Sequence, residues 1–219
     1  MMRDRLVIVC TANMIRSPFI AGLLASRLAS SPQVRLHLES AGTAARPGAS
    51  ATGEVLEVAR TYGLDLSTHR ARRLTDGILQ PGDTVLCAER THRRVVLDLR
   101  PDLISSVFTV REFARRAEAV CARGEATDWP SMVRAAGRQR LATPGEGGGE
   151  DDIVDPIGGS RSVWRDFERQ ATLAVSSILG AVSTLSAPAS ATSEPRPMTR
   201  REYRRRSVGA SSHPVVRGA

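Results

Sequence analysis

The sequence predicts an α/β fold, a doubly wound four-stranded parallel sheet with helices on both faces. Two observations predict it. Short apolar runs typical of buried parallel strands recur along the first half of the chain, and a segment with helical spacing of apolar residues follows each of them. Because parallel strands need a crossover connection, this alternation is typical of a sheet built from strand–helix–strand units.

The first strand and helix are the most clearly marked. Residues 6–9 form an all-apolar run that stops at Cys10. Ser17 and Pro18 predict a helix start, since Pro is favoured at the first helical position, and apolar residues then recur at helical spacing as far as Ser30. The prediction is a buried strand, a tight loop and a helix.

The next three units follow the same pattern. Residues 34–38 alternate as a second strand that ends at Ser40, and a loop of small residues at 42–49 leads to a helix that begins its apolar pattern at Val55 and ends at Gly63.

A third strand is predicted at residues 83–87, after a Pro-Gly turn, with a helix at 95–99. A fourth strand is predicted at residues 107–110, with a helix at 112–122.

The rest of the chain is less regular. Residues 129–155 are expected to be a mobile loop, which overlaps an irregular insertion at about 123–150, and residues 163–185 regain a helical pattern. The last stretch is rich in Pro, Ser, Ala and Arg and cannot offset its ordering entropy. We therefore expect a folded domain at 1–186 and a disordered Arg-rich tail at 187–219.

Charge and composition exclude some classes of function. The chain has 219 residues and a net charge of +8, but the tail holds seven Arg against two Glu and so carries most of that charge. Aromatic residues make up only 4%, too few for base stacking across a basic surface. The body is not expected to bind nucleic acid.

The cysteines indicate a reducing compartment. The chain has three cysteines, Cys10, Cys87 and Cys121, an odd number at wide spacing, so no disulfide framework is expected. No CxxC pair or Cys/His cluster has the sequence spacing of metal ligands, so no metal site is expected. The apolar run at 6–10 is too short for a secretory signal, and residues 171–193 resemble a packing helix more than a membrane span. We expect a cytoplasmic protein without a membrane span.

The loop between the first strand and helix carries the chemistry. A tight loop that ends at a helix N-terminus turns its backbone N–H groups inward, which makes a cradle for a tetrahedral oxyanion. Arg16 can hold two phosphate oxygens with its planar fork, and the same field favours the nucleophilic thiolate of Cys10. Ser17 could donate to the sulfur when it departs. The predicted phosphate-binding residues are Thr11, Ala12, Asn13, Met14, Ile15, Arg16 and Ser17.

The segment Cys10-Thr11-Ala12-Asn13-Met14-Ile15-Arg16-Ser17-Pro18 resembles the signature of the low-molecular-weight protein tyrosine phosphatases of bacterial type. Ser40-Ala41-Gly42-Thr43 and the segment around His69 resemble two further motifs of that family. The resemblance implies a phosphatase domain at 1–186 that hydrolyses phosphotyrosine or aryl phosphates through a phosphocysteine, with no cofactor or metal. It also implies that Asn13, Ser17, Ser40 and His69 form hydrogen bonds that support the loop.

The resemblance also implies a general acid. The family takes it from an Asp-Pro pair late in the chain, and Asp155-Pro156 resembles that pair, with Asp152 as the fallback if the register differs. Cys10, Arg16 and Asp155 are therefore the predicted catalytic residues. The implied partner is a phosphotyrosine protein, with a bacterial tyrosine kinase as one candidate, and the oligomeric state is left open.

Three departures from the family pattern stand out. Ile15 stands where many members have a second cysteine, so the usual redox partner is missing. Ile157 replaces a frequent Tyr, and Arg46 replaces an aromatic or aliphatic wall, which weakens the case for an aryl slot.

Three alternative functions remain open. A phosphoarginine phosphatase would favour a small polar residue in place of Met14, and an arsenate reductase would need further cysteines near Cys87. A non-enzymatic phosphate-binding module would need neither Cys10 nor Asp155.

Overall fold

The computed structural model describes residues 4–29, 31, 34–142 and 148–185. The tail expected at 187–219, and residues 143–147 of the expected insertion, lie outside the described residues.

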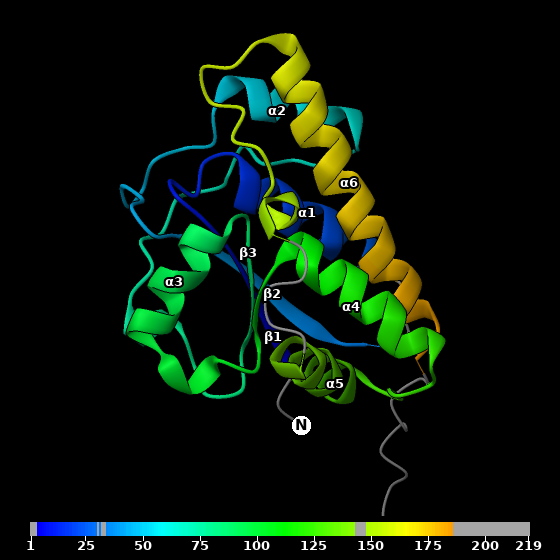
Figure 1. Ribbon diagram of the computed structural model, residues 1–219. Coiled ribbons are helices and arrows are strands. Elements are labelled where there is room, and N and C mark those ends of the chain that lie inside the picture. The colour runs from blue at the N-terminus through cyan, green and yellow to red at the C-terminus, as the bar shows by residue number, and fades with distance from the viewer. Residues whose placement is uncertain (1–3, 30, 32–33, 143–147, 186–219) are drawn as a thin grey trace, which may run out of the picture. The chain divides into compact units, whose positions relative to one another are not determined.

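The described chain forms a four-stranded parallel sheet in the order β2-β1-β3-β4 (Figure 1). This confirms the predicted fold class. The first two strands run parallel for seven residues, and Cys10 lies opposite Gly42 where both strands end. The strands are β1 (Asp4–Cys10), β2 (Leu36–Gly42), β3 (Thr84–Cys87) and β4 (Val107–Thr109).

Helices cover both faces of this sheet. Alternate residues of β1 point to opposite faces: Leu6 and Ile8 pack with residues of α1, α4 and α6, whereas Val7 and Val9 pack with Val96 of α3. The helices are α1 (Arg16–Leu28), α2 (Gly53–Thr61), α3 (Arg90–Leu99), α4 (Val110–Ala122), α5 (Trp129–Ala142) and α6 (Arg161–Ser183). Short 3-10 turns occupy Asp76–Ile78, Pro101–Leu103 and Gly148–Asp151.

Local sequence fixes several helix ends. The Thr109 hydroxyl accepts the amide of Glu112, and the Glu112 carboxylate accepts the amide of Thr109, so α4 starts directly at the end of β4. Gly63 has φ 71°, which ends α2 at the residue expected from the sequence.

The expectation of an irregular loop at 129–155 is wrong for its first half, which forms helix α5. Trp129 and Met132 are buried in the main core, and the Trp129 indole donates to Thr84 Oγ1 at 3.2 Å. Gly137 lets the helix approach the chain before β4, since a Cβ there would lie 2.3 Å from the Ser105 carbonyl oxygen. After Trp129 and Met132, the core-facing side of α5 consists of small residues, which hide the helical periodicity of its apolar residues.

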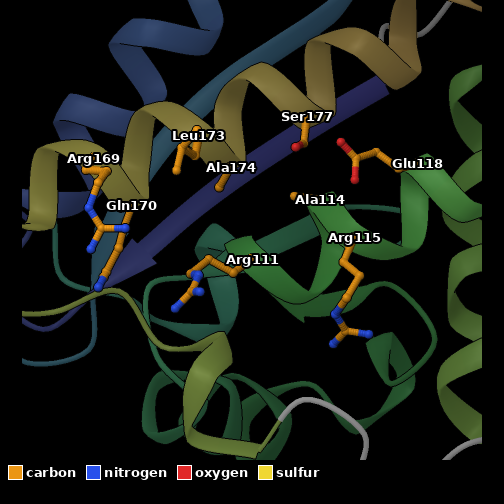
Figure 2. A pocket seen from close by; sticks show the side chains of 9 residues that line it. All are labelled: Arg111, Ala114, Arg115, Glu118, Arg169, Gln170, Leu173, Ala174 and Ser177. Atoms are coloured by element: carbon orange, nitrogen blue, oxygen red, sulfur yellow. The ribbon is translucent and has the colours of Figure 1, made fainter.

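Helices α4 and α6 pack along each other on the same face of the sheet (Figure 2). Ala114 and Ala174 are both buried at this contact, and small side chains let the two helices come close. Among the helices that the structure describes, none is both long and apolar enough to cross a bilayer.

Candidate active site

The loop from Cys10 to Arg16 joins β1 to α1 at the carboxyl edge of the sheet. Its backbone turns back toward the sulfur, and the amide of Asn13 donates to Cys10 Sγ at 3.3 Å. Ser17 Oγ, in the first turn of α1, lies 3.0 Å from the same sulfur. The Cys10 thiol therefore faces polar donors at the start of a helix, as the sequence predicts.

The N-terminus of α1 is well suited to an anion. Its N-cap residue is Ile15, whose side chain cannot accept a hydrogen bond, and no acidic residue lies in the first turn. The first amides of the helix and its dipole are therefore left to a bound anion rather than to a capping side chain.

Asn13 holds the loop in shape. It lies in the left-handed region at φ 54°, a conformation that Asn tolerates better than most residues. Its amide Nδ2 donates to Ser17 Oγ and to Ser40 Oγ, both at 2.9 Å, and its backbone carbonyl lies 2.7 Å from His69 Nε2. The structure thus brings together the four residues predicted to support the loop. Asn13 Oδ1 also accepts the amide of Arg72 at 2.8 Å.

The end of β2 is packed directly against this loop. The amide of Thr43 donates to the Cys10 carbonyl, and the amide of Ala44 donates to the Thr11 carbonyl, both at 2.9 Å. A Cβ on Gly42 would lie only 2.5 Å from the Thr11 carbonyl oxygen. Residue 42 must therefore lack a side chain if the loop is to keep this position.

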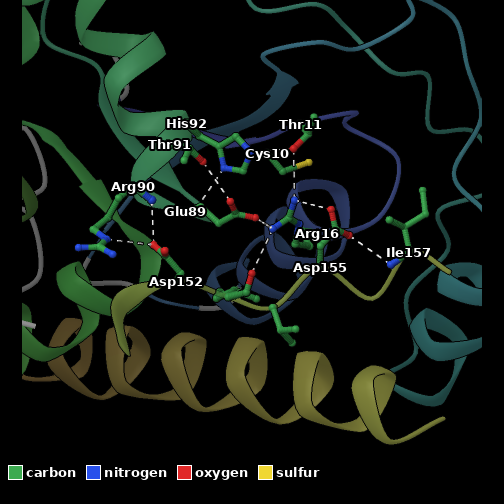
Figure 3. Close-up of polar contacts among 12 residues, drawn as sticks. Cys10, Thr11, Arg16, Glu89, Arg90, Thr91, His92, Asp152, Asp155 and Ile157 are labelled. Atoms are coloured by element: carbon green, nitrogen blue, oxygen red, sulfur yellow. Dashed lines mark hydrogen bonds and ion pairs between the residues drawn. The ribbon is translucent and has the colours of Figure 1, made fainter. Parts of the chain in front are cut away.

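Arg16 is the point at which distant segments of the chain meet (Figure 3). Its side chain is only 2% exposed. Its guanidinium donates to Asp155 Oδ2 at 2.7 Å, to the Ile153 carbonyl at 3.1 Å and to Thr11 Oγ1 at 3.3 Å, and it also pairs with Glu89. The buried cation is thus balanced by two carboxylates.

The two candidate acids occupy different places. Asp155 contacts Arg16, and its second oxygen accepts the amide of Ile157 at 3.2 Å. Asp152 instead accepts the amide of Arg90 at 2.8 Å, at the start of α3. Of the two candidate acids, Asp155 is therefore the one that contacts the guanidinium, whereas Asp152 is engaged away from it.

Two residues that meet the loop from Cys10 to Arg16 lie at the start of α3, just after β3, and were not predicted from the sequence. Glu89 pairs with Arg16, and although its burial opposes ionisation, the hydrogen bond and charge of Arg16 outweigh this and lower the pKa of Glu89. His92 accepts the amide of Glu89 at Nδ1 and lies 2.8 Å from Thr11 Oγ1 through Nε2. The available signal was their position just after a parallel strand, where sites of α/β proteins gather.

Cys87 lies close in the sheet but faces the other way. It is opposite Val9 in the register and packs in the same core as Val9, whereas Cys10 is the next residue along β1. Burial raises the pKa of the Cys87 thiol well above its usual range. Cys87 is therefore poorly placed to form a disulfide with Cys10.

The fold thus places Cys10 and Arg16 at the two ends of a loop between β1 and α1, as a phosphatase of the resembled family would require. The model of the low molecular weight phosphotyrosine protein phosphatase family matches residues 5–122, and the chain belongs to this family.

The chain is also similar to individual phosphatases, in sequence and in structure. Over 107 residues the chain is 33% identical to the probable low molecular weight protein-tyrosine-phosphatase EpsP of Ralstonia solanacearum. The aligned segment covers 49% of this chain and 70% of EpsP. Over 160 residues it is 23% identical to the protein-arginine-phosphatase of Bacillus subtilis. This aligned segment covers 73% of this chain and 84% of that protein. The crystal structure of the low molecular weight protein tyrosine phosphatase from T. tengcongensis superposes with a TM-score of 0.60 at 25% identity, over 81% of this chain and 98% of that one.

Proposed function

We propose that this protein is a protein tyrosine phosphatase that hydrolyses aryl phosphate esters through a phosphocysteine at Cys10. The observation that carries the proposal is the arrangement around the sulfur: Ser17 Oγ and the Asn13 amide face Cys10 Sγ, and the same loop ends at Arg16, which contacts Asp155. Nucleophile, oxyanion binder and acid are thus linked through one short loop and one ion pair.

In the first step, the Cys10 thiolate attacks phosphorus and the bond from phosphorus to the leaving oxygen breaks. The loop amides and Arg16 hold the equatorial oxygens, where charge is spread in the transition state. The substrate phosphate replaces the Asp155 carboxylate on Arg16, and Asp155 then acts in its protonated form. It gives this proton to the departing oxygen, which leaves as a neutral phenol.

In the second step, water attacks the phosphocysteine. Asp155, now a carboxylate, takes the proton of that water, and the phosphorus–sulfur bond breaks with its electron pair returning to sulfur. Ser17 stabilises the returning thiolate by donating its hydroxyl proton in a hydrogen bond, over the 3.0 Å that separates the two atoms.

Cys10→Ser tests the nucleophile. It should abolish turnover of p-nitrophenyl phosphate but retain phosphate binding, because the loop amides and Arg16 remain. Retention of more than a few per cent of the activity would refute the assignment.

Asp155→Asn tests the acid, with Asp152→Asn as its matched control. Asp155→Asn should cost roughly 100-fold for basic leaving groups and much less for acidic ones, whereas Asp152→Asn should show no such dependence. An equal loss across the leaving-group series would mean that Asp155 is structural.

Phosphoarginine is the second candidate substrate. The match to the Bacillus subtilis protein-arginine-phosphatase extends over 160 residues, against 107 for EpsP. In addition, the residue after the Asp-Pro pair is Ile157, which is 64% exposed and offers no aromatic ring for an aryl slot. Turnover of phosphotyrosine, phosphoarginine, phosphoserine and arsenate, measured side by side with Cys10→Ser as the blank, distinguishes the candidates.

The proposed partner is a phosphotyrosine protein, and a bacterial tyrosine kinase is one candidate for it. A trapping variant, Cys10→Ser, should retain such a phosphoprotein, and free phosphate should release it.

A further inference from the structure

An open groove of about 170 Å³ lies between α4 and α6, outside the loop that holds Cys10. Figure 2 shows three arginines at this groove, one carboxylate, Glu118, beside Ser177, and small or apolar side chains between the helices. This volume has room for part of a small ligand only, so the rest of the ligand would extend into solvent. The arginines are Arg111 and Arg115 on α4 and Arg169 on α6.

Among these cations, Arg111 is the one available to an anion. Arg115 pairs with Asp151 at 3.0 Å, and Arg169 pairs with Asp166 at 3.0 Å. Arg111 donates to the Asp152 carbonyl at 3.2 Å, and it forms no ion pair within the described part of the chain. A planar guanidinium that meets only a neutral acceptor is well suited to a carboxylate, which it can bind with two parallel hydrogen bonds.

The middle of the groove is apolar. Leu173 is 59% exposed there, and the buried Ala114 and Ala174 lie beside it. An apolar chain laid on Leu173 would remove this surface from water. The tail at 187–219 does not match the groove in charge, since it carries seven Arg against two Glu.

We propose that this groove binds a small organic acid, with its carboxylate on Arg111 and a short apolar chain on Leu173. The Arg111 end favours an anion over a cation, whereas Glu118 lies apart from it beside Ser177, and the aliphatic centre disfavours a fully polar anion.

The groove is connected to the segment that carries the proposed acid. Arg111 holds the carbonyl of Asp152, and Gln170 accepts the amide of Val154 at 2.9 Å, one residue before Asp155. A carboxylate on Arg111 competes with the Asp152 carbonyl and so changes how this segment is held. This coupling rests on the proposed function, whereas the binding itself does not.

Calorimetry with sodium octanoate tests the binding. Inorganic phosphate is kept in excess to occupy the Cys10 loop. Octanoate should bind saturably at about millimolar concentration, and octanol and octylammonium should not. Leu173→Asp and Arg111→Gln should each weaken binding by about tenfold or more, whereas Ile104→Asp, a matched change at a residue 51% exposed outside the groove, should leave it unchanged. Absence of saturable binding, or equal binding by all variants, would overturn the proposal.

Kinetics without added phosphate tests the coupling. Saturating octanoate should change the ratio of rates for basic and acidic leaving groups severalfold, and Leu173→Asp should keep its basal activity but lose this effect. Binding without a change in that ratio would overturn the coupling. Failure of the proposed function would appear differently, as an inactive enzyme that still binds octanoate.

Discussion

Replacing Gly42 by alanine tests how closely β2 supports the catalytic loop. The backbone of Gly42 does not lie at positive φ, so alanine brings no conformational penalty of its own. Its methyl group would instead meet three backbone atoms of the loop, at 2.5 Å from the Thr11 carbonyl oxygen, 2.8 Å from the Asn13 amide nitrogen and 2.9 Å from the Ala12 carbonyl carbon.

The size of the effect follows from these distances. The shortest contact is about 0.9 Å inside the 3.4 Å at which ordinary contact begins, and backbone atoms cannot rotate away as a side chain can. The loop must therefore shift by several tenths of an ångström. Overpacking of this kind costs about 1–3 kcal/mol of unfolding free energy, and a displacement near 1 Å can cost about 100-fold in rate.

The assay compares kcat for p-nitrophenyl phosphate, the Kd for inorganic phosphate and the free energy of unfolding in urea. Gly42→Ala should lower kcat by about 100-fold and weaken phosphate binding, while the protein remains folded at 25 °C. Far-ultraviolet circular dichroism checks the fold at the temperature of the assay.

Gly53→Ala is the matched control, because a Cβ at Gly53, the first residue of α2, meets no atom within 4 Å. It should keep full activity and gain slightly in stability. If Gly42→Ala retained activity within twofold of the parent protein, the argument that the loop rests on the backbone of residue 42 would be wrong.

Three further predictions concern single side chains. Glu89→Gln should lower kcat/KM by about tenfold, because Arg16 loses a charged partner that orients its guanidinium. Steady-state kinetics measures this ratio, and an unchanged value would contradict the role of Glu89 in orienting Arg16. His92 has its pKa lowered from 6.5, mainly by burial and further by the charge of Arg16, so the neutral form is favoured in the folded state. The unfolding free energy should therefore be highest above pH 6.5, fall as the pH decreases toward the lowered pKa, and level off below it; urea titrations should show that His92→Gln flattens this dependence. Peroxide should oxidise Cys10 with poor recovery on adding thiol, because Cys87 faces the other side of the sheet. Peptide mass mapping that found a dominant disulfide between Cys10 and Cys87 would contradict this.

Much of this molecule could be predicted from local signals. Apolar runs marked β1, β3 and β4, and an alternating pattern marked β2 at the edge of the sheet, to within two residues at most ends. The loop from Cys10 to Arg16 was visible because its function needs residues close together in sequence. Asp155 required the family resemblance, since it lies 139 residues after Arg16.

What was missed depends on tertiary contacts. Helix α5 was predicted as a loop because its large buried residues lie only in its first turns, and Ala135, Ala136 and Gly137 then give little hydrophobic contrast. Glu89 belonged to no recognisable motif, and only the folded chain places it on Arg16, 73 residues earlier.

The contacts of Arg16 bear on when the enzyme becomes active during its synthesis. Its partners Glu89, Ile153 and Asp155 lie 73, 137 and 139 residues further along the chain. Cys10 and Arg16 leave the ribosome before these partners, so the guanidinium meets the last of them only after most of the domain has emerged. A nascent or prematurely terminated chain therefore carries the Cys10 thiol without all of the proposed catalytic residues, so phosphate ester cleavage is expected to begin only once the domain has been finished.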